Sequence, residues 1–229
     1  MLVYEIRNGH YIIDLEGKKW LLDTGSPTTF RFDGQGGCIE LDGKVFSLER
    51  NRGYIKSAVD GLCGVNVFGM IGSDVLSQTS FTLYSDNKLQ LMANQKSDYS
   101  FDVSCYDNVI LGYIEIEGRR VKTLFDTGAS LNYLMPGAFT FDLNNTSIVH
   151  DLDNQGRKIT SNLVIAKASL GGKKMDVSFG IPQHECNATI AMAHYGCQAI
   201  VGIYNYYLKK PLFNHMFSVD YQNGKIFID

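Results

Sequence analysis

The chain has 229 residues, of which 45% are hydrophobic and 20% are charged, and its net charge is −3. This composition is typical of a globular protein that can bury a sizeable core, in one large domain or two small ones. The small negative charge gives no reason to expect nucleic acid or an anionic membrane as a partner, and no apolar run reaches the roughly 20 residues of a membrane helix. Abundant Tyr, Phe and Gly favour a β-rich fold.

The N-terminal segment and the cysteines bear on location. Residues 1–7 lack the basic start and apolar core of a signal peptide, which predicts a cytoplasmic protein, or a secreted or periplasmic one if a signal has been removed. The five cysteines are an odd number at irregular spacing, so most are expected to be buried free thiols. Cys186 and Cys197 could close a short loop in an oxidising compartment; the sequence leaves this open.

The first half is predicted to consist of strands joined by tight turns. Its expected elements, in order, are a hairpin turning at Glu16-Gly17, the tripeptide Asp23-Thr24-Gly25, a strand at 28–32, a hairpin turning at Asp42-Gly43, the apolar run 70–72 that ends in Gly72, a short helix at 73–77 and a final hairpin turning at Asp86-Asn87. Asp74 is interpreted as a cap of the short helix.

The second half repeats this order. Its elements are a hairpin turning at Glu117-Gly118, the tripeptide Asp126-Thr127-Gly128, a strand at 131–134, a hairpin turning at Gly171-Gly172, the apolar run 200–202, a short helix at 203–208 and a final hairpin turning at Asn223-Gly224. The repetition predicts an internal duplication, with an N-terminal lobe at 1–94 and a C-terminal lobe at 95–229, joined by the polar stretch 94–98.

The two Asp-Thr-Gly tripeptides are the strongest functional signal. Each follows an apolar, strand-like run, and each half has one. Gly25 and Gly128 let the backbone turn sharply and approach a neighbour closely. Two lobes related by a pseudo-twofold axis would bring Asp23 and Asp126 together, where both carboxyls cannot ionise and one proton is shared. Such a pair can activate water to attack an amide without a covalent intermediate.

These motifs resemble those of the aspartic peptidases of the pepsin and retropepsin clan, and the resemblance extends over residues 3–229. It implies an all-β acid-protease fold of two pseudo-twofold-related lobes with a central cleft and few short helices. It also implies that Asp23 and Asp126 are catalytic, that Thr24 and Thr127 cross-bond beneath them, and that Gly25 and Gly128 line the substrate-binding strand. No metal or organic cofactor is implied.

The two halves differ at the residue after Asp-Thr-Gly, which is Ser26 in one and Ala129 in the other. In the family a hydroxyl at this position can bond the neighbouring aspartate and favour its charged form. Ser26 is therefore predicted to support the dyad, giving Asp23 more of the negative charge and Asp126 more of the proton.

The hairpin that closes over substrate in this clan, the flap, has little room in the first half. Only residues 33–37 are available there, whereas residues 151–159 of the second half offer an ample segment. The longer segment favours a flap from the second lobe, but the sequence leaves open which lobe supplies the working flap.

A cluster of His184, Cys186, His194 and Cys197 contains zinc-ligand types, but its spacing fits no standard zinc motif, so ordinary packing or a disulfide is the favoured interpretation.

The sequence thus predicts an aspartic endopeptidase, monomeric, acting on an extended polypeptide. The alternative is a non-catalytic peptide-binding or scaffolding module that retains the same fold. Side-chain preference, working pH and activation by removal of a prosegment are left open.

Overall fold

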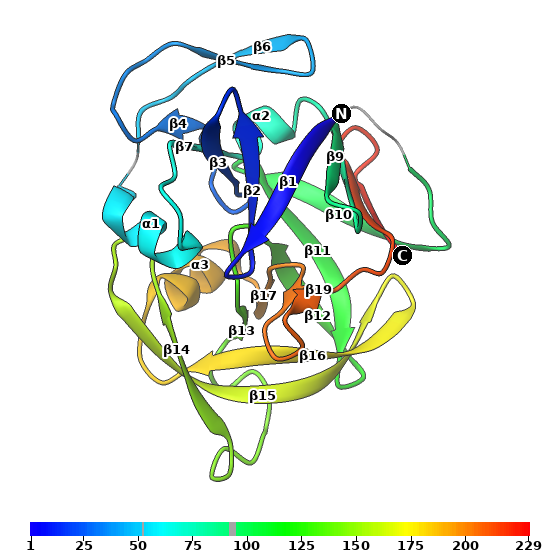
Figure 1. The fold of residues 1–229 in the computed structure, drawn as a ribbon. Helices are drawn as coiled ribbons and strands as arrows, with labels where there is room; N and C mark the ends of the chain where they lie inside the picture. The colour runs from blue at the N-terminus through cyan, green and yellow to red at the C-terminus, as the bar shows by residue number, and fades with distance from the viewer. Residues whose placement is uncertain (52, 92–94) are drawn as a thin grey trace.

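The computed structural model describes residues 1–51, 53–91 and 95–229. These residues are mostly β-structure, 48% strand and 9% helix, so the all-β prediction is confirmed (Figure 1). Three short helices lie within the described ranges: α1 (Lys56–Cys63), α2 (Ser73–Leu76) and α3 (Asn187–Tyr195). None of them is long and apolar enough to cross a bilayer.

The strands of the two halves follow one another in the same order. The first half contains β1 (Leu2–Arg7), β2 (His10–Leu15), β3 (Lys18–Leu22), β4 (Phe30–Arg31), β5 (Cys38–Leu41), β6 (Lys44–Ser47), β7 (Gly69–Ile71), β8 (Phe81–Tyr84) and β9 (Lys88–Leu91). The second half contains β10 (Tyr99–Tyr106), β11 (Val109–Ile116), β12 (Arg119–Phe125), β13 (Asn132–Leu134), β14 (Ser147–Leu152), β15 (Lys158–Leu170), β16 (Lys173–Pro182), β17 (Ala199–Val201), β18 (Tyr204–Asn205), β19 (Lys210–Pro211), β20 (Met216–Asp220) and β21 (Lys225–Ile228).

The predicted hairpin turns form where the sequence placed them. Glu16 and Gly17, with φ of 53° and 77°, connect β2 to β3, and Glu117 and Gly118, with φ of 50° and 72°, connect β11 to β12. Positive φ at both central residues gives a turn whose twist matches that of the flanking strands. The strands that lead to the two Asp-Thr-Gly loops are therefore set up in the same way in each half.

Each of these leading strands is paired on both edges. β3 lies between β2 and β7, and β12 lies between β11 and β17. The pairings β3–β7 and β12–β17 are parallel, with Leu22 opposite Ile71 and Phe125 opposite Val201. Both strand ends are buried, so the position of the backbone at the start of each loop is fixed.

A six-stranded antiparallel sheet joins the two halves, in the order β1-β9-β8-β20-β21-β10. At its centre β8 of the first half pairs with β20 of the second, and the hydroxyls of Thr82 and Ser218 lie 2.7 Å apart. One apolar cluster with members from both halves includes Trp20, Phe125 and Phe217. The lobes therefore share a sheet and a core. Residue 94, the predicted lobe boundary, lies outside the described residues.

The helix predictions were partly correct. α2 forms, but the helix predicted at 203–208 is wrong: β18 pairs there with β19, and Ile203 and Lys209 have φ of 52° and 50°, which a right-handed helix cannot contain. Asp74 lies inside α2 and is not its N-cap. Its carboxylate instead accepts hydrogen bonds from the backbone N–H and the hydroxyl of Thr29. α1 and α3 are additional helices that the sequence interpretation did not include.

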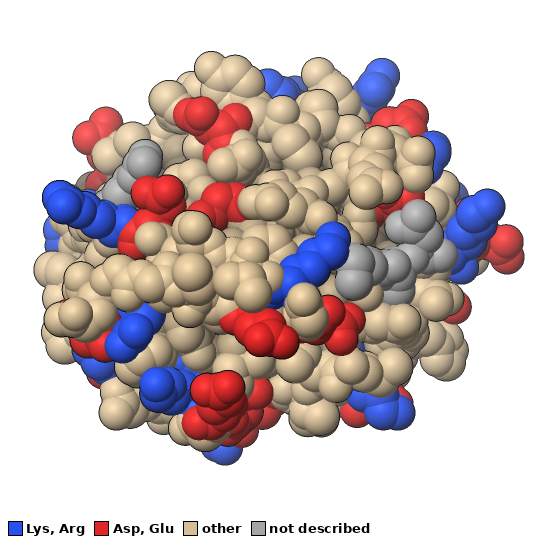
Figure 2. All heavy atoms as spheres, turned by 90° about the horizontal axis from the view of Figure 1, so that it is seen from above, with Lys and Arg blue, Asp and Glu red and all other residues tan. Residues whose placement is uncertain are grey.

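Figure 2 shows one face of the molecule in which acidic and basic side chains are interspersed among uncharged surface. Neither sign gathers into a continuous patch on this face.

Candidate active site

The two predicted aspartates meet at the junction of the lobes. Asp23 follows β3 directly and Asp126 follows β12 directly. The N–H of Asp23 donates to the carbonyl of Ile71 at 3.0 Å, and that of Asp126 donates to the carbonyl of Val201 at 2.9 Å. The same parallel pairing thus fixes the backbone of both aspartates.

Thr24 and Thr127 bind each other's loop reciprocally. The Thr24 hydroxyl donates to the Phe125 carbonyl at 3.0 Å and accepts the Thr127 N–H at 3.0 Å. The Thr127 hydroxyl donates to the Leu22 carbonyl at 2.8 Å and accepts the Thr24 N–H at 3.0 Å. Both side chains are buried, where hydrogen bonds are strengthened and costly to leave unmade. This cross-bonding matches the arrangement expected for Thr24 and Thr127.

Gly25 and Gly128 each lie against the carboxyl of the opposite loop. A Cβ added to Gly25 would come within 2.4 Å of the Asp126 Cγ, and one added to Gly128 would come within 2.4 Å of the Asp23 Cγ. Neither position has room for a side chain. The absence of a Cβ at these two glycines is therefore what lets the carboxyls approach each other across the junction.

Ser26 supports Asp23 in a different way from the one predicted. Its hydroxyl donates to the Thr28 carbonyl at 2.9 Å, so the predicted hydroxyl bond to the aspartate is wrong. The backbone N–H groups of Ser26 and Gly25 donate to Asp23 Oδ1, each at 2.9 Å. Because a backbone N–H does not depend on the residue type, the Ser26–Ala129 difference does not decide the charge distribution.

Asp23 is buried and Asp126 is half-buried, and the two carboxyls lie within hydrogen-bonding reach of each other. Burial, followed by the negative charge of Asp126, raises the pKa of Asp23 well above its usual range. Burial also raises the pKa of Asp126, opposed by the hydrogen bond from Asp23 and by N–H donors. Two N–H groups stabilise charge on Asp23, and the N–H of Gly128 stabilises charge on Asp126 at 2.8 Å, so the shared proton belongs to the pair.

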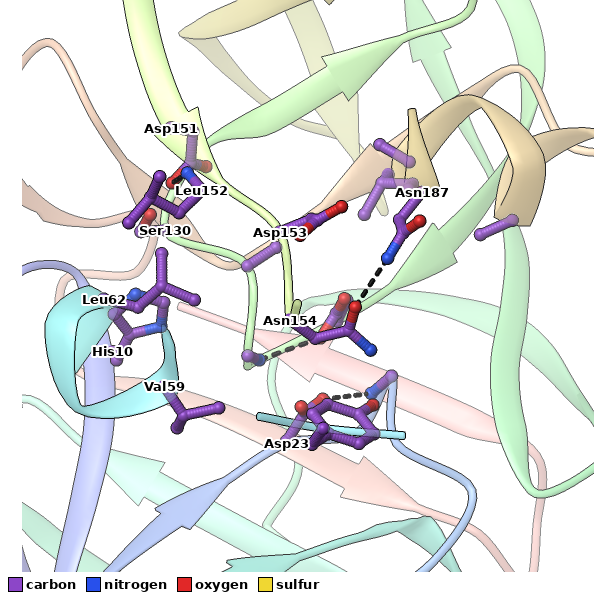
Figure 3. A pocket seen from close by; sticks show the side chains of 18 of the residues that line it. His10, Asp23, Val59, Leu62, Ser130, Asp151, Leu152, Asp153, Asn154 and Asn187 are labelled. Atoms are coloured by element: carbon purple, nitrogen blue, oxygen red, sulfur yellow. Dashed lines mark hydrogen bonds between the residues drawn. The ribbon is translucent and has the colours of Figure 1, made fainter. Parts of the chain in front are cut away.

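A cavity of about 240 Å³ lies over the pair (Figure 3). Its lining comes from both halves and includes His10, Asp23, Tyr54, Val59, Leu62, Asp126, Ser130, Tyr133, Asp151, Leu152, Asp153, Asn154, Asn187 and Ala188. The cavity is roofed by the covering hairpin, residues 147–163, which β14 forms with the start of β15.

The tip of the covering hairpin is attached to both halves. The Asn154 carbonyl accepts the N–H of Ile55, at the start of α1, at 2.9 Å. The Asn154 side chain accepts a hydrogen bond from Asn187, at the start of α3. The segment that covers the cavity therefore comes from the second half, a point that the sequence left open. The first half's hairpin, β5–β6, forms a separate two-stranded sheet (Figure 1).

Three cavity residues were missed by the sequence interpretation. Tyr54 lies beside the dyad, and burial, followed by the charge of Asp23, raises its pKa. Asn187 holds the covering hairpin, and His10 lines the wall of the cavity. His10 could have been found, because the β2–β3 register places it opposite Asp23. Tyr54 and Asn187 are brought in by helices α1 and α3, and no motif marked them.

The other suspected cluster does not assemble. Cys186 and Cys197 are both free, as are the other three cysteines. Within the described ranges, no group of three or more His, Cys, Asp or Glu side chains is placed to hold a metal ion.

Comparison with known proteins shows no family for this chain. No protein-family model matches the chain, and no curated protein matches it. The function has to be inferred from the geometry of the two loops and of the cavity above them.

The contact between glycine and carboxyl predicts a steric effect. Gly128→Ala is expected to destabilise the fold by about 1–3 kcal/mol, because the new methyl group collides with the Asp23 carboxyl in a packed junction. Gly36→Ala is the matched control, since a Cβ there meets open space and its φ is not positive. Urea denaturation of both variants measures the difference; equal stabilities would contradict the close approach.

The raised pKa values predict a pH dependence of stability. The folded pair holds a proton that the unfolded chain releases near pH 4, so its contribution to stability is present at low pH and is lost as pH rises through the folded pKa values. The double variant Asp23→Asn, Asp126→Asn lacks this term. Its stability relative to wild type should rise with pH above about 4, by at most about 1.4 kcal/mol per pH unit for one proton. A constant difference in urea denaturation from about pH 4 to 7 would refute the shift.

Proposed function

We propose that this chain is an aspartic endopeptidase that hydrolyses peptide bonds with water activated between Asp23 and Asp126. The observation that carries the proposal is the pair of carboxyls, each set against the glycine of the opposite loop and held by the Thr24–Thr127 cross-bonds beneath a covered cavity. A stabilising ion pair would need a cation beside each carboxylate. Here two rigid loops hold two carboxyls so close together that one of them keeps its proton, which leaves one acid and one base available for catalysis.

The proposed reaction uses the one proton of the pair. The ionised carboxyl takes a proton from water as the water oxygen attacks the peptide carbonyl carbon, while the protonated carboxyl donates to the carbonyl oxygen. The resulting tetrahedral diol then loses its C–N bond. The ionised carboxyl takes the proton of one diol hydroxyl as the carbonyl re-forms, while the protonated carboxyl gives its proton to the leaving amine, so the pair regains its starting proton count. No covalent enzyme intermediate and no cofactor are required.

The proposed substrate is an extended polypeptide lying between the dyad and the covering hairpin. Strand-like hydrogen bonds to the hairpin would hold such a substrate. Both aspartates come from one chain, which supports a monomeric enzyme. A cytoplasmic location stays a prediction from the sequence.

Entry of an extended chain requires the covering hairpin to move, because its tip is bonded to the start of α1 over the cavity. The tip is freed when three hydrogen bonds break: Ile55 to Asn154, Asn187 to Asn154, and Arg157 to Asn187. The remainder of the hairpin belongs to the larger sheet of the second half and can stay in place.

Removal of either carboxylate tests the proposed chemistry. Asp23→Asn and Asp126→Asn should each lower kcat for an unfolded protein substrate at least about a thousandfold, because an amide cannot take the proton from water. Asp142→Asn removes an exposed carboxylate of the same lobe and serves as the control. Cleavage is followed by mass spectrometry between about pH 3 and pH 8.

The alternative gives a different result. A peptide-binding module would cleave nothing in any variant, yet would retain peptide in a binding measurement. Activity that persists in both active-site variants would reject the aspartate mechanism altogether.

Loosening of the hairpin tip should be visible without substrate. Asn187→Ala removes two side-chain hydrogen bonds to the hairpin tip, the one that Asn187 donates to Asn154 and the one that it accepts from Arg157. Each is worth about 1 kcal/mol, so amide hydrogen exchange at residues 153–157 should accelerate about thirtyfold. Asn144→Ala, at an exposed position in the same lobe, is the control. Unchanged exchange at the tip would show that these contacts do not hold the hairpin.

A further inference from the structure

His10 is a buried polar residue that its surroundings leave unsatisfied. It starts β2 and is only 3% exposed. Neither ring nitrogen has a hydrogen-bond partner of ordinary geometry among the described residues, although the Gly128 backbone lies close enough to act on the ring as an acceptor. An unpaired buried polar group costs on the order of 1–3 kcal/mol. The corresponding first residue of β11 is Val109, so packing at this place does not require an imidazole.

The imidazole lies where two hollows of the molecule adjoin. It lines the cavity over the dyad and also a second hollow of about 330 Å³. The residues common to both linings are His10, Leu62, Ser130, Asp151 and Leu152. Figure 3 shows these five at one end of the cavity, away from Asp153, Asn154 and Asn187. We refer to them as the His10 end.

Charge at the His10 end is negative and unbalanced. Asp151 accepts two neutral donors, the Tyr133 hydroxyl at 2.7 Å and the Leu152 N–H at 2.8 Å. Asp153, in contrast, is paired with Arg157 at 2.7 Å. No Lys or Arg lines the cavity within the part of the chain that the structure describes, and the ion pairs found there include none with Asp151.

We propose that the His10 end is a subsite for a Lys or Arg side chain of the peptide substrate, an inference that rests on the proposed peptidase function and names its substrate class. Leu62 and Leu152 would pack against the methylene stem, as apolar surface does with long cationic side chains. The cationic head would bond the Asp151 carboxylate and a lone pair of the neutral His10 ring, giving this imidazole the partner that it lacks.

Protonation of His10 should oppose this binding. Burial lowers the pKa of His10, while the charge of Asp151, the Gly128 backbone and the charge of Asp126 act to raise it. Two further titratable groups, His150 and Lys158, line the outer hollow, and neither lines the cavity. The ring is therefore neutral at neutral pH, and the preference for a cation should weaken as pH falls through the lowered pKa.

The test uses pairs of peptides of one neutral sequence that carry either Lys or norleucine at each position in turn. Norleucine keeps the methylene stem and lacks the amine. At one position near the cleaved bond, wild type should favour Lys by about tenfold in kcat/KM, a factor typical of one charge-assisted contact. Asp151→Asn should bring this ratio close to one. His10→Val, which copies Val109, should lower the ratio and abolish its decline at acid pH.

Glu16→Gln is the control, because it removes one negative charge at an exposed turn and should leave the ratio unchanged. A wild-type enzyme that favours Lys at no position, or a ratio that survives Asp151→Asn, overturns the subsite.

If wild type cleaves no peptide, binding of the same pairs by fluorescence anisotropy decides between the two proposals. A Lys preference that Asp151→Asn removes supports the subsite and rejects the peptidase. Equal binding of both peptides overturns the subsite.

Discussion

The reciprocal bonding of Thr24 and Thr127 is the constraint on which the rest of this molecule depends. Four hydrogen bonds of 2.8–3.0 Å tie the end of β3 to the end of β12, and all of them are buried. Each loop completes the hydrogen bonding of the other, so neither loop could keep its conformation in a separated lobe without leaving buried polar groups unpaired. The shared six-stranded sheet serves the same end, because it fixes the distance between the two leading strands.

This rigid junction supports an unfavourable arrangement at its surface. Two carboxyls are held together in a buried site, each against the bare Cα of the opposite glycine. Bringing the two carboxyls together out of water is electrostatically unfavourable. A retained proton and the N–H donors of both loops offset this free energy. The raised pKa values are thus a direct result of the cross-bonded backbone, and they provide the acid and base that the proposed hydrolysis needs.

The pseudo-symmetry of the two loops is broken by what surrounds them. The covering hairpin exists in the second half alone, and its counterpart region in the first half is a five-residue connection at 33–37. His10 stands where the second half has Val109, so one end of the cavity is polar. The two similar halves therefore enclose an asymmetric cavity. Such a cavity suits a peptide, because the two ends of a peptide chain differ and the chain binds in one direction.

The sequence by itself determined the repeated strand order, the turns and the identity of both loops, because these follow from local patterns: apolar runs, Gly-containing turns and Asp-Thr-Gly. It also favoured a covering segment in the second half by the length available. It failed for Ser26, whose hydroxyl bonds Thr28, for the strand pair at 204–211, and for Tyr54, His10 and Asn187. The register of the first hairpin could have pointed to His10. The others were decided by the tertiary structure, because contacts between residues far apart in the chain determine which acceptor a hydroxyl bonds and which residues line a cavity.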